Sequence, residues 1–535
     1  MSSVLLTRDG WLFKVNDKCF KVMDDLFSTD FDVKFAEILG VEVKNAWIIK
    51  NQLIENYWPA SLDEWRNLFP GVVGEDGTVK LLILTLATLK LRNPEERLMG
   101  VIVEASNSAG KSHIIKEILK PLRPLNIVFE FTRMTGAFLE RKFQNENVDR
   151  KILYLQESNN APAQLHLILS EGKLHIGLVE RNDGGLKPTE IVVEGQPFLV
   201  ITTSNWTGSQ DLVHRCIVVN LDESREQTLR ILAHQVKLNS DPVFSELFTL
   251  FCNGCMKIFK ILWQKIPENI DVVVPFLPLL EQKIQSLPNI NIKLRRDFRK
   301  LISLIKASAI LFYKNRIMAV REKNYAKNTI IIATLEDLRN VLELIDSGMR
   351  QVLTSLGEKE LQVLKTMAEA KQEFYNYSEL ARLTGLPSST LRLVIIPRLE
   401  NKGYVLVDRE SRPHRIELVR EDFENPKLYI EEEQAEKFIK DCIQELSLIG
   451  YSFTLPEKTS ENGLNHEKKP QERVVVETTQ DLGFSDKNKL KESFSEKNLE
   501  KSSDSKNKPV ERVVCTTTHD LSFFFENNPQ NGEIS

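Results

Sequence analysis

A short apolar strand that runs into a small-residue loop and Gly-Lys-Ser most constrains the fold of this 535-residue chain. Residues 101–103 are all β-branched, which suits a buried strand. The loop covers residues 105–112, and a helical pattern follows at 113–120. Strand, loop and helix in this order predict a phosphate-binding loop in an α/β fold. Gly-Lys-Ser alone would also fit a chance turn before a helix. The segments downstream are therefore needed to distinguish a phosphate loop from such a turn.

The loop is expected to hold a nucleotide through its backbone N–H groups and the dipole of the following helix. Lys111 is expected to reach the β- and γ-phosphates, and the Ser112 hydroxyl to bind Mg²⁺. Ala105 stands where the first glycine is usual, and its methyl group is tolerated if φ is negative. The expected nucleotide contacts are Ala105, Ser106, Asn107, Ser108, Ala109, Gly110, Lys111 and Ser112.

A second apolar strand, residues 151–155, ends in a polar pair. Parallel strands place such residues at the carboxyl edge of a sheet, beside the phosphates. Glu157 is therefore the candidate catalytic base that orients and deprotonates the attacking water. Gln156 stands where an aspartate is usual. It would reach Mg²⁺ through a bound water, but without a charge.

Residues 173–179 and 189–194 alternate like two strands around a turn, which predicts a β-hairpin. Arg181 and Lys187 lie near its tip and are candidate DNA-binding residues. An ordinary sheet edge with solvated charges is the alternative. The next buried strand ends at Asn205, a candidate nucleotide contact.

Three helical segments and two strands between residues 357 and 422 predict a winged helix. Pro397 is expected to end its third helix early. A winged helix used for packing or protein contact is the alternative. Its candidate DNA-phosphate contacts are Arg392, Arg409, Arg412 and Arg415.

The chain from about residue 456 is polar and is expected to be disordered. Two copies of one motif begin at Pro470 and Pro509. They predict twin binding sites for a protein partner, and duplication without function is the alternative.

Composition bounds the partners and the compartment. The net charge is −4, so contacts to nucleic acid must come from local basic patches. No signal-peptide layout and no run of about 20 apolar residues occurs, so we expect a soluble, cytoplasmic protein without membrane contact. Cys252 and Cys255 form one isolated Cys-x-x-Cys pair in an apolar segment, which favours two thiols in a helix core over a zinc site.

Taken together, SAGKSHIIKEIL, KILYLQES, ILSEGKLHI, the VITTS strand, HRCIVVNLDES and LRRDFRKLISLIKASAIL resemble one family. It is the AAA+ ATPase module of mobile-element (plasmid and virus) replication proteins, as found in zinc-finger primase-helicases and related to MCM helicases. The resemblance covers about residues 71–316. It implies an AAA+ core with a helical lid, a hexameric ring of identical subunits, ATP with Mg²⁺, and a hairpin that points into a DNA-binding pore.

The same resemblance gives roles to three arginines. Arg215, just before the fifth strand, would be the finger that reaches a neighbouring subunit's nucleotide. Arg295 or Arg296 would fold back over the nucleotide of its own subunit. The chain departs from the family at Ala105 and Gln156, and it lacks a zinc-finger primase half.

Two functions stay open at this point. One is an ATP-driven DNA translocase or helicase that replicates a mobile element, which the basic hairpin favours. The other is a DNA-binding AAA+ ATP switch, such as an origin-binding loader or regulator, which Gln156 favours. A catalytically weak scaffold is a third.

The expected organisation has seven parts. They are a small N-terminal domain (1–70), the P-loop AAA+ core (71–222), a helical lid (223–325), a linking helix (326–356), the winged helix (357–422), a helical connection (423–455) and the tail (456–535).

Overall fold

The computed structural model describes most of the chain up to residue 455. Asn205 and the tail with its two motif copies lie outside the described residues. The described ranges are 2–15, 18–158, 161–182, 185–204, 206–285, 294–323, 326–344, 358–401, 403–419 and 430–455.

A five-stranded sheet, here called the central sheet, has every strand parallel to its neighbours. The strand order is β10-β4-β9-β6-β5. The strand that leads into the phosphate loop, β4, thus lies between β10 and β9. The strands are β4 (Gly100–Glu104), β5 (Val128–Phe131), β6 (Ile152–Leu155), β9 (Phe198–Thr203) and β10 (Ile217–Asn220).

Alternate residues of these strands enter two hydrophobic clusters, one on each face of the sheet. In β4, Val101 and Val103 belong to the larger cluster and Ile102 to the smaller. This is the period-two pattern of a parallel sheet buried on both faces. The helices that contribute to the two clusters include α4 (Asp76–Ala87), α5 (Lys111–Leu119), α6 (Gly136–Lys142) and α7 (Ala163–Glu171).

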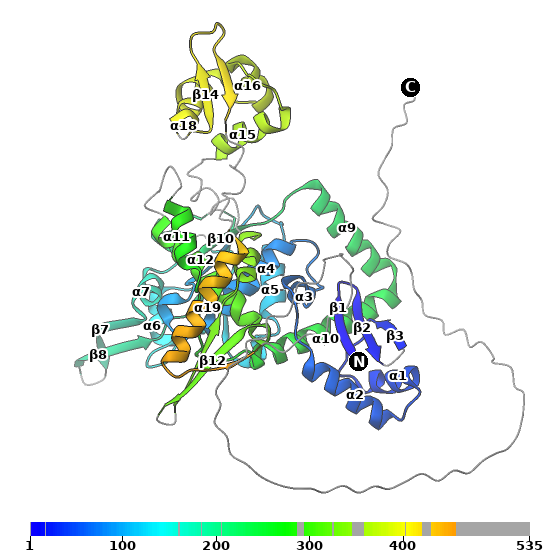
Figure 1. Ribbon diagram of the computed structural model, residues 1–535. Coiled ribbons are helices and arrows are strands. Elements are labelled where there is room, and N and C mark those ends of the chain that lie inside the picture. Colours follow the sequence, from blue (N-terminus) through cyan, green and yellow to red (C-terminus); the bar gives the residue numbers. More distant parts are fainter. Residues whose placement is uncertain are drawn as a thin grey trace, which may run out of the picture. The chain divides into compact units, whose positions relative to one another are not determined.

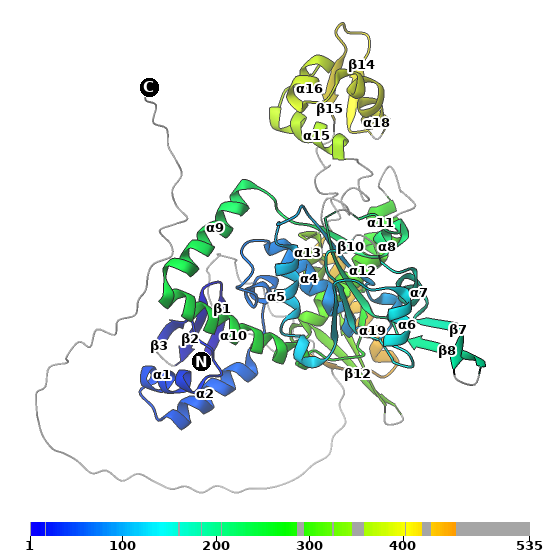
Figure 2. The same ribbon diagram turned by 180° about the vertical axis from the view of Figure 1, so that it is seen from behind.

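The predicted hairpin is confirmed as β7 (Lys173–Asn182) and β8 (Gly185–Glu194), and it projects from the body of the core (Figures 1 and 2). Its register pairs Arg181 with Leu186 and Glu180 with Lys187. A residue with an acidic side chain therefore stands opposite one of the two basic residues. The side chains of Arg181 and Lys187 lie outside the described part of the structure.

The N-terminal residues form an antiparallel sheet and three helices that share the larger cluster with the rest of the protein. Trp11 meets Phe251 edge to face, with ring centroids 6.3 Å apart. The Trp58 indole donates to the Leu311 carbonyl oxygen at 2.8 Å. The elements are β1 (Ser3–Thr7), β2 (Gly10–Val15), β3 (Lys18–Val22), α1 (Thr29–Leu39), α2 (Val43–Asn56) and α3 (Leu62–Asn67).

After the central sheet the chain forms the expected helices, and none of those in the described ranges is long and apolar enough to cross a membrane. Cys252 and Cys255 both lie on α10, as expected for thiols of a helix. The helices are α8 (Gln210–Arg215), α9 (Arg225–Ser240), α10 (Pro242–Lys265), α11 (Leu277–Gln285), α12 (Leu294–Leu311), α13 (Leu335–Leu342) and α19 (Glu432–Leu448).

The expected helical lid and linking helix need a correction, because strands lie between these helices. Residues 317–332 form a β-hairpin within a second sheet, of order β11-β13-β12-β16. The pairing of β12 with β16 joins positions far apart in sequence, which a local pattern does not show. The strands are β11 (Asp271–Val273), β12 (Ile317–Lys323), β13 (Ala326–Ile332) and β16 (Ser452–Thr454).

Residues 358–419 contain helices followed by a two-stranded antiparallel sheet, around a hydrophobic cluster of their own. This unit is inserted rather than appended, because the chain afterwards returns through α19 to pair β16 with β12. Its elements are α15 (Glu358–Ala370), α16 (Tyr377–Thr384), α17 (Ser388–Thr390), α18 (Ile396–Asn401), β14 (Val405–Asp408) and β15 (Arg415–Leu418).

The prediction that Pro397 ends the third helix early is wrong. A π-helical turn, Leu391–Ile395, carries α17 into α18, and the N–H of Ile396 donates to the Leu391 carbonyl. A proline inside an α-helix removes one hydrogen bond and clashes with the carbonyl four residues earlier. The wider π turn changes that spacing and lets the helix continue past Pro397.

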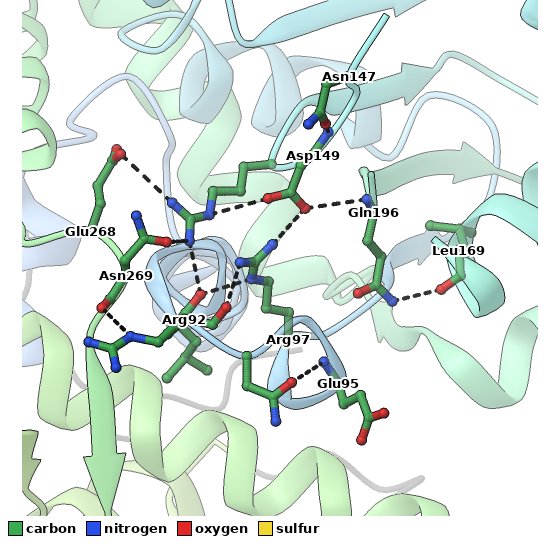
Figure 3. Close-up of polar contacts among 12 residues, drawn as sticks. Arg92, Glu95, Arg97, Asn147, Asp149, Leu169, Gln196, Glu268 and Asn269 are labelled. Atoms are coloured by element: carbon green, nitrogen blue, oxygen red, sulfur yellow. Dashed lines mark hydrogen bonds and ion pairs between the residues drawn. The ribbon is translucent and has the colours of Figure 1, made fainter. Parts of the chain in front are cut away.

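A network of charged side chains ties the segments that precede β4, β6 and β9 (Figure 3). The buried guanidinium of Arg97 donates to Asp149 Oδ1 at 2.7 Å and to the carbonyl oxygens of Leu91 and Arg92 at 2.9 and 3.0 Å. Asp149 also accepts from the N–H of Gln196 at 3.3 Å. The Asp149 carboxylate thus binds both the Arg97 side chain and the backbone just before β9.

The same network reaches residues 268–271, which lead into β11 (Figure 3). Lys90 is buried and pairs with Glu268 at 2.9 Å, while Arg150 lies 3.8 Å from the same carboxylate and bonds to Asn269. The hydrogen bond from Lys90 lowers the pKa of Glu268. The second sheet is thereby joined to the amino edge of the central one.

Replacing Asp149 with alanine tests this junction. Asp149→Ala should lower the free energy of unfolding by about 3 kcal/mol, because the buried Arg97 charge loses its partner. Urea denaturation of both proteins measures the difference. Glu95→Ala, an exposed acidic residue in the same region, should change stability by less than about 0.5 kcal/mol. Equal effects of the two substitutions would contradict the role of Asp149.

Candidate nucleotide site

The predicted phosphate loop joins the carboxyl end of β4 to α5. Gly110 and Ser108 have positive φ, +90° and +70°, whereas Ala105 does not. Ala105 therefore has a backbone conformation that tolerates its methyl group. The N–H of Ala105 donates to the carbonyl of Thr203 in the neighbouring β9 at 3.3 Å. Left-handed backbone at Gly110 favours glycine, and the first N–H groups of α5, which have no partner within the helix, suit an anion.

Lys111 is held over this loop. Its side chain is buried, and its ammonium donates to the carbonyl oxygens of Ala105 at 2.9 Å and Ser106 at 2.7 Å. The N–H of Ser106 donates to the carboxylate of Glu223, which stands just before α9. The start of α9 is thus attached to the loop. Sequence reasoning did not single out Glu223.

The candidate base, Glu157, follows β6 in a left-handed backbone conformation with φ of +47°. Such a conformation costs a residue other than glycine about 1 kcal/mol, and it recurs at functional sites. Two hydrogen bonds hold the turn: Gln156 N–H to the Phe131 carbonyl at 2.8 Å, and Glu157 N–H to Thr202 Oγ1 at 3.0 Å. The Glu157 side chain is exposed at the carboxyl edge of the sheet.

The fully buried Tyr154 connects this turn to the phosphate loop. Burial raises the pKa of Tyr154, contacts to Thr202 and Ser112 oppose the rise, and the nearby charges of Glu130 and Glu157 add to it. Its hydroxyl lies beside these groups, yet it makes no hydrogen bond of normal geometry within the described residues. Ser112 and Glu157, far apart in sequence, therefore approach the same tyrosine.

Ser112 and Gln156 carry oxygen atoms of the kind that Mg²⁺ binds. This ion takes one or two protein oxygen ligands and keeps several waters beside the substrate phosphates. The hydroxyl of Ser112 can bind directly, and the half-buried amide of Gln156 can hold a bound water. Because Gln156 is uncharged, the ion would be held with less charge than an aspartate gives.

A cavity of about 830 Å³ opens over the loop, which is within the usual range for a small-molecule site. Its lining includes residues 106–110 of the loop and residues of α9 and α10. The lining is mixed, because it also includes the acidic residues Glu75, Glu117, Asp222 and Glu223. The apolar lining includes Val72, Ile231, Leu238 and Phe248.

Two rings on the lid helices form part of this lining. The centroids of His234 and Phe248 lie 4.9 Å apart in an edge-to-face pair. Burial lowers the pKa of His234, with smaller effects of Lys237 and His113. The imidazole is thus favoured in its neutral form at neutral pH. No motif marks these residues, so sequence reasoning missed them.

The segment before α4 forms another wall, although its sequence suggested only a connection. Gln227 is buried, and its amide donates to the Val73 carbonyl at 2.7 Å. Gly74 has φ of +66°, and a Cβ there would lie 2.2 Å from the same amide. The positive φ favours glycine at this position, and a Cβ there would displace the Gln227 amide. In the sequence, only the glycines of this segment could have indicated its role in the site.

Arg215 ends α8, at the amino end of β10. The register aligns Ile217 with Val101, so Arg215 lies at the edge opposite its own phosphate loop. Its side chain is half-buried. Burial raises the pKa of the neighbouring Cys216 thiol to about 12. Arg215 is thus separated from its own phosphate loop by the length of the strand, and its role as a finger stays a prediction.

Arg295 and Arg296 lie exposed in the first turn of α12. Neither is among the residues that line the cavity. Their predicted contact with nucleotide stays a prediction, as does that of Asn205.

The arginines predicted to contact DNA in the 358–419 unit differ in their surroundings. Arg409 forms two hydrogen bonds to Glu400, which neutralise its charge. The guanidinium of Arg415 lies 5.4 Å from the Phe374 ring centroid, and Arg392 also packs on an aromatic ring. All four are exposed: Arg392, Arg409, Arg412 and Arg415.

Comparison with known proteins does not assign a family. No family model matches, and no curated protein matches. Among solved structures, the chain matches a point mutant of RuvB from Thermotoga maritima at 15% identity, covering 70% of this chain and 100% of that one, with a TM-score of 0.21. Likeness at this level carries no argument about fold or function. Any assignment of function therefore depends on the residues of the site.

Proposed function

We propose that the protein is an AAA+ ATP hydrolase. The observation that supports this most is the joint placement of Lys111 and Ser112 after β4 and of Glu157 after β6, at one edge of a parallel sheet. A nucleotide bound there would extend into the cavity that opens over residues 106–110 of the loop. The apolar wall beyond the loop suits its base.

Each residue has a definite task in hydrolysis. Lys111 leaves the loop carbonyls and binds the β- and γ-phosphates, while the N–H groups at the start of α5 bind phosphate oxygens. Ser112, and Gln156 through a bound water, would hold Mg²⁺, which would supply positive charge next to those phosphates. Glu157 accepts a proton from the attacking water.

We further propose that hydrolysis drives movement along DNA, in the replication of a mobile element. Three features support this: the motif resemblance, the projecting hairpin, and the exposed arginines on a unit with the element order of a winged helix. A hexameric ring would bring the hairpins of several subunits together. Each would add a few phosphate contacts to the grip on DNA.

One observation favours the alternative of a DNA-binding ATP switch that does not unwind. Gln156 lacks the negative charge with which an aspartate would hold the Mg²⁺ shell. Slow hydrolysis with tight ATP binding would suit a loader or regulator. Strand displacement on forked DNA with ATP separates the two functions, because only a translocase releases the strand.

Substitutions at Lys111 and Glu157 should separate binding from hydrolysis. Lys111→Ala should weaken ATP binding and abolish turnover, whereas Glu157→Gln should bind ATP normally and hydrolyse it at least about 100-fold more slowly. Fluorescent-nucleotide titration and phosphate release measure the two steps. Normal turnover in either variant would contradict the assigned site.

The hairpin should govern the response to DNA. The double variant Arg181→Ala, Lys187→Ala should keep the basal ATPase rate, but lose most of the DNA stimulation. The rate is measured with and without DNA over a salt series. The matched control is Lys173→Ala, a basic residue at the base of the hairpin, and it should respond like wild type. A double variant that still responds fully would place DNA elsewhere.

Arg215 should act on a neighbouring subunit. Arg215→Ala should bind ATP almost normally but hydrolyse it about 10³-fold more slowly. Mixing it with excess Lys111→Ala protein should restore part of the rate, because one subunit supplies the intact loop and the other the intact arginine. Mixed oligomers without activity would exclude this role for Arg215.

A further inference from the structure

The turn that carries Glu157 depends on one buried side chain of the neighbouring strand. Thr202 lies in β9, between β4 and β6, and is fully buried. Its hydroxyl oxygen accepts from the N–H of Glu157 at 3.0 Å, and its carbonyl accepts from the N–H of Ser158 at 2.9 Å. Two successive peptide groups are therefore fixed by a single residue.

The strand register explains why Thr202 can do this. The pairing of β9 with β6 ends at Ile201 and Leu155, one position before Thr202. After Leu155 the chain leaves the regular pairing with β9. The Glu157 N–H therefore donates to the side-chain oxygen of Thr202, because the carbonyl oxygen of Thr202 accepts from Ser158 instead. On its other edge β9 continues, and the carbonyl of Thr203 accepts from the N–H of Ala105.

The bond also selects a conformation. At φ of +47° Glu157 adopts a left-handed backbone that L-residues avoid, and no glycine relieves it. Such a conformation persists when the surroundings fix it. A free N–H buried beside Thr202 would be costly, so the left-handed turn and the hydroxyl acceptor require each other.

We propose that Thr202 is a positioning residue for catalysis: its hydroxyl holds the Glu157 peptide so that the carboxylate stands over the phosphate loop. The inference rests on the proposed ATP hydrolysis. It assigns to β9 a role that neither the phosphate loop nor the glutamate motif reveals.

Thr202→Val tests the proposal, because valine keeps the shape and removes the acceptor. We expect kcat for ATP to fall at least about 10-fold while KM stays within about 2-fold, since the base is displaced and nucleotide binding is not. Thr202→Ser keeps the hydroxyl and should recover most of kcat. Equal losses in the valine and serine variants, or an unchanged kcat in Thr202→Val, would overturn the proposal.

A matched control separates positioning from folding. Thr85 in α4 is equally buried, and its hydroxyl donates to the Leu82 carbonyl at 2.8 Å. Thr85→Val should lower the melting temperature without changing kcat. If Thr85→Val lowers kcat as much as Thr202→Val does, the effect is one of general stability and the proposal fails.

Amide hydrogen exchange gives a readout that does not need turnover. The Glu157 amide should exchange slowly in wild type and in Thr202→Ser, and at least about 10-fold faster in Thr202→Val. Equal exchange in wild type and Thr202→Val would refute the hydrogen bond. Absence of ATP hydrolysis in wild type with this exchange pattern intact would instead refute the proposed function.

Discussion

The parallel pairing of β4, β9 and β6 is the constraint on which the site depends. It aligns Glu104 with Thr203 and Leu155 with Ile201, so the phosphate loop and the glutamate turn leave the sheet at nearly the same level. Hydrophobic side chains on both faces hold this register, because a slip of one residue would exchange the two faces. The relative positions of the phosphate loop and the glutamate turn therefore depend on the hydrophobic packing of the central sheet.

The central sheet and its loop could be predicted because their signals are local. Each strand is a short apolar run that ends in polar residues, and a chance turn at Gly110-Lys111-Ser112 is hard to reconcile with the strands that follow it. The hairpin was predictable for the same reason, since alternation and turn residues lie within about 20 positions. These signals do not depend on knowing which strands are neighbours.

Other parts could not be predicted because their cause is non-local or geometric. The pairing of β12 with β16 closes a loop of more than 100 residues, and no local pattern records it. The π turn before Pro397 is a backbone adjustment that the residue types do not specify. Glu223, Gln227 and His234 enter the site because α9 packs beside the loop, although their own sequence context is that of an ordinary helix.

The insertion of residues 358–419 has a mechanical consequence. Both of its connections lead back to one place: the incoming chain leaves from α13, and the outgoing chain ends in α19 and β16. Near the first anchor, Asp337 forms a bidentate ion pair with the buried Arg316, which begins the strand region. A force on the inserted unit would be shared by two attachment points on the second sheet.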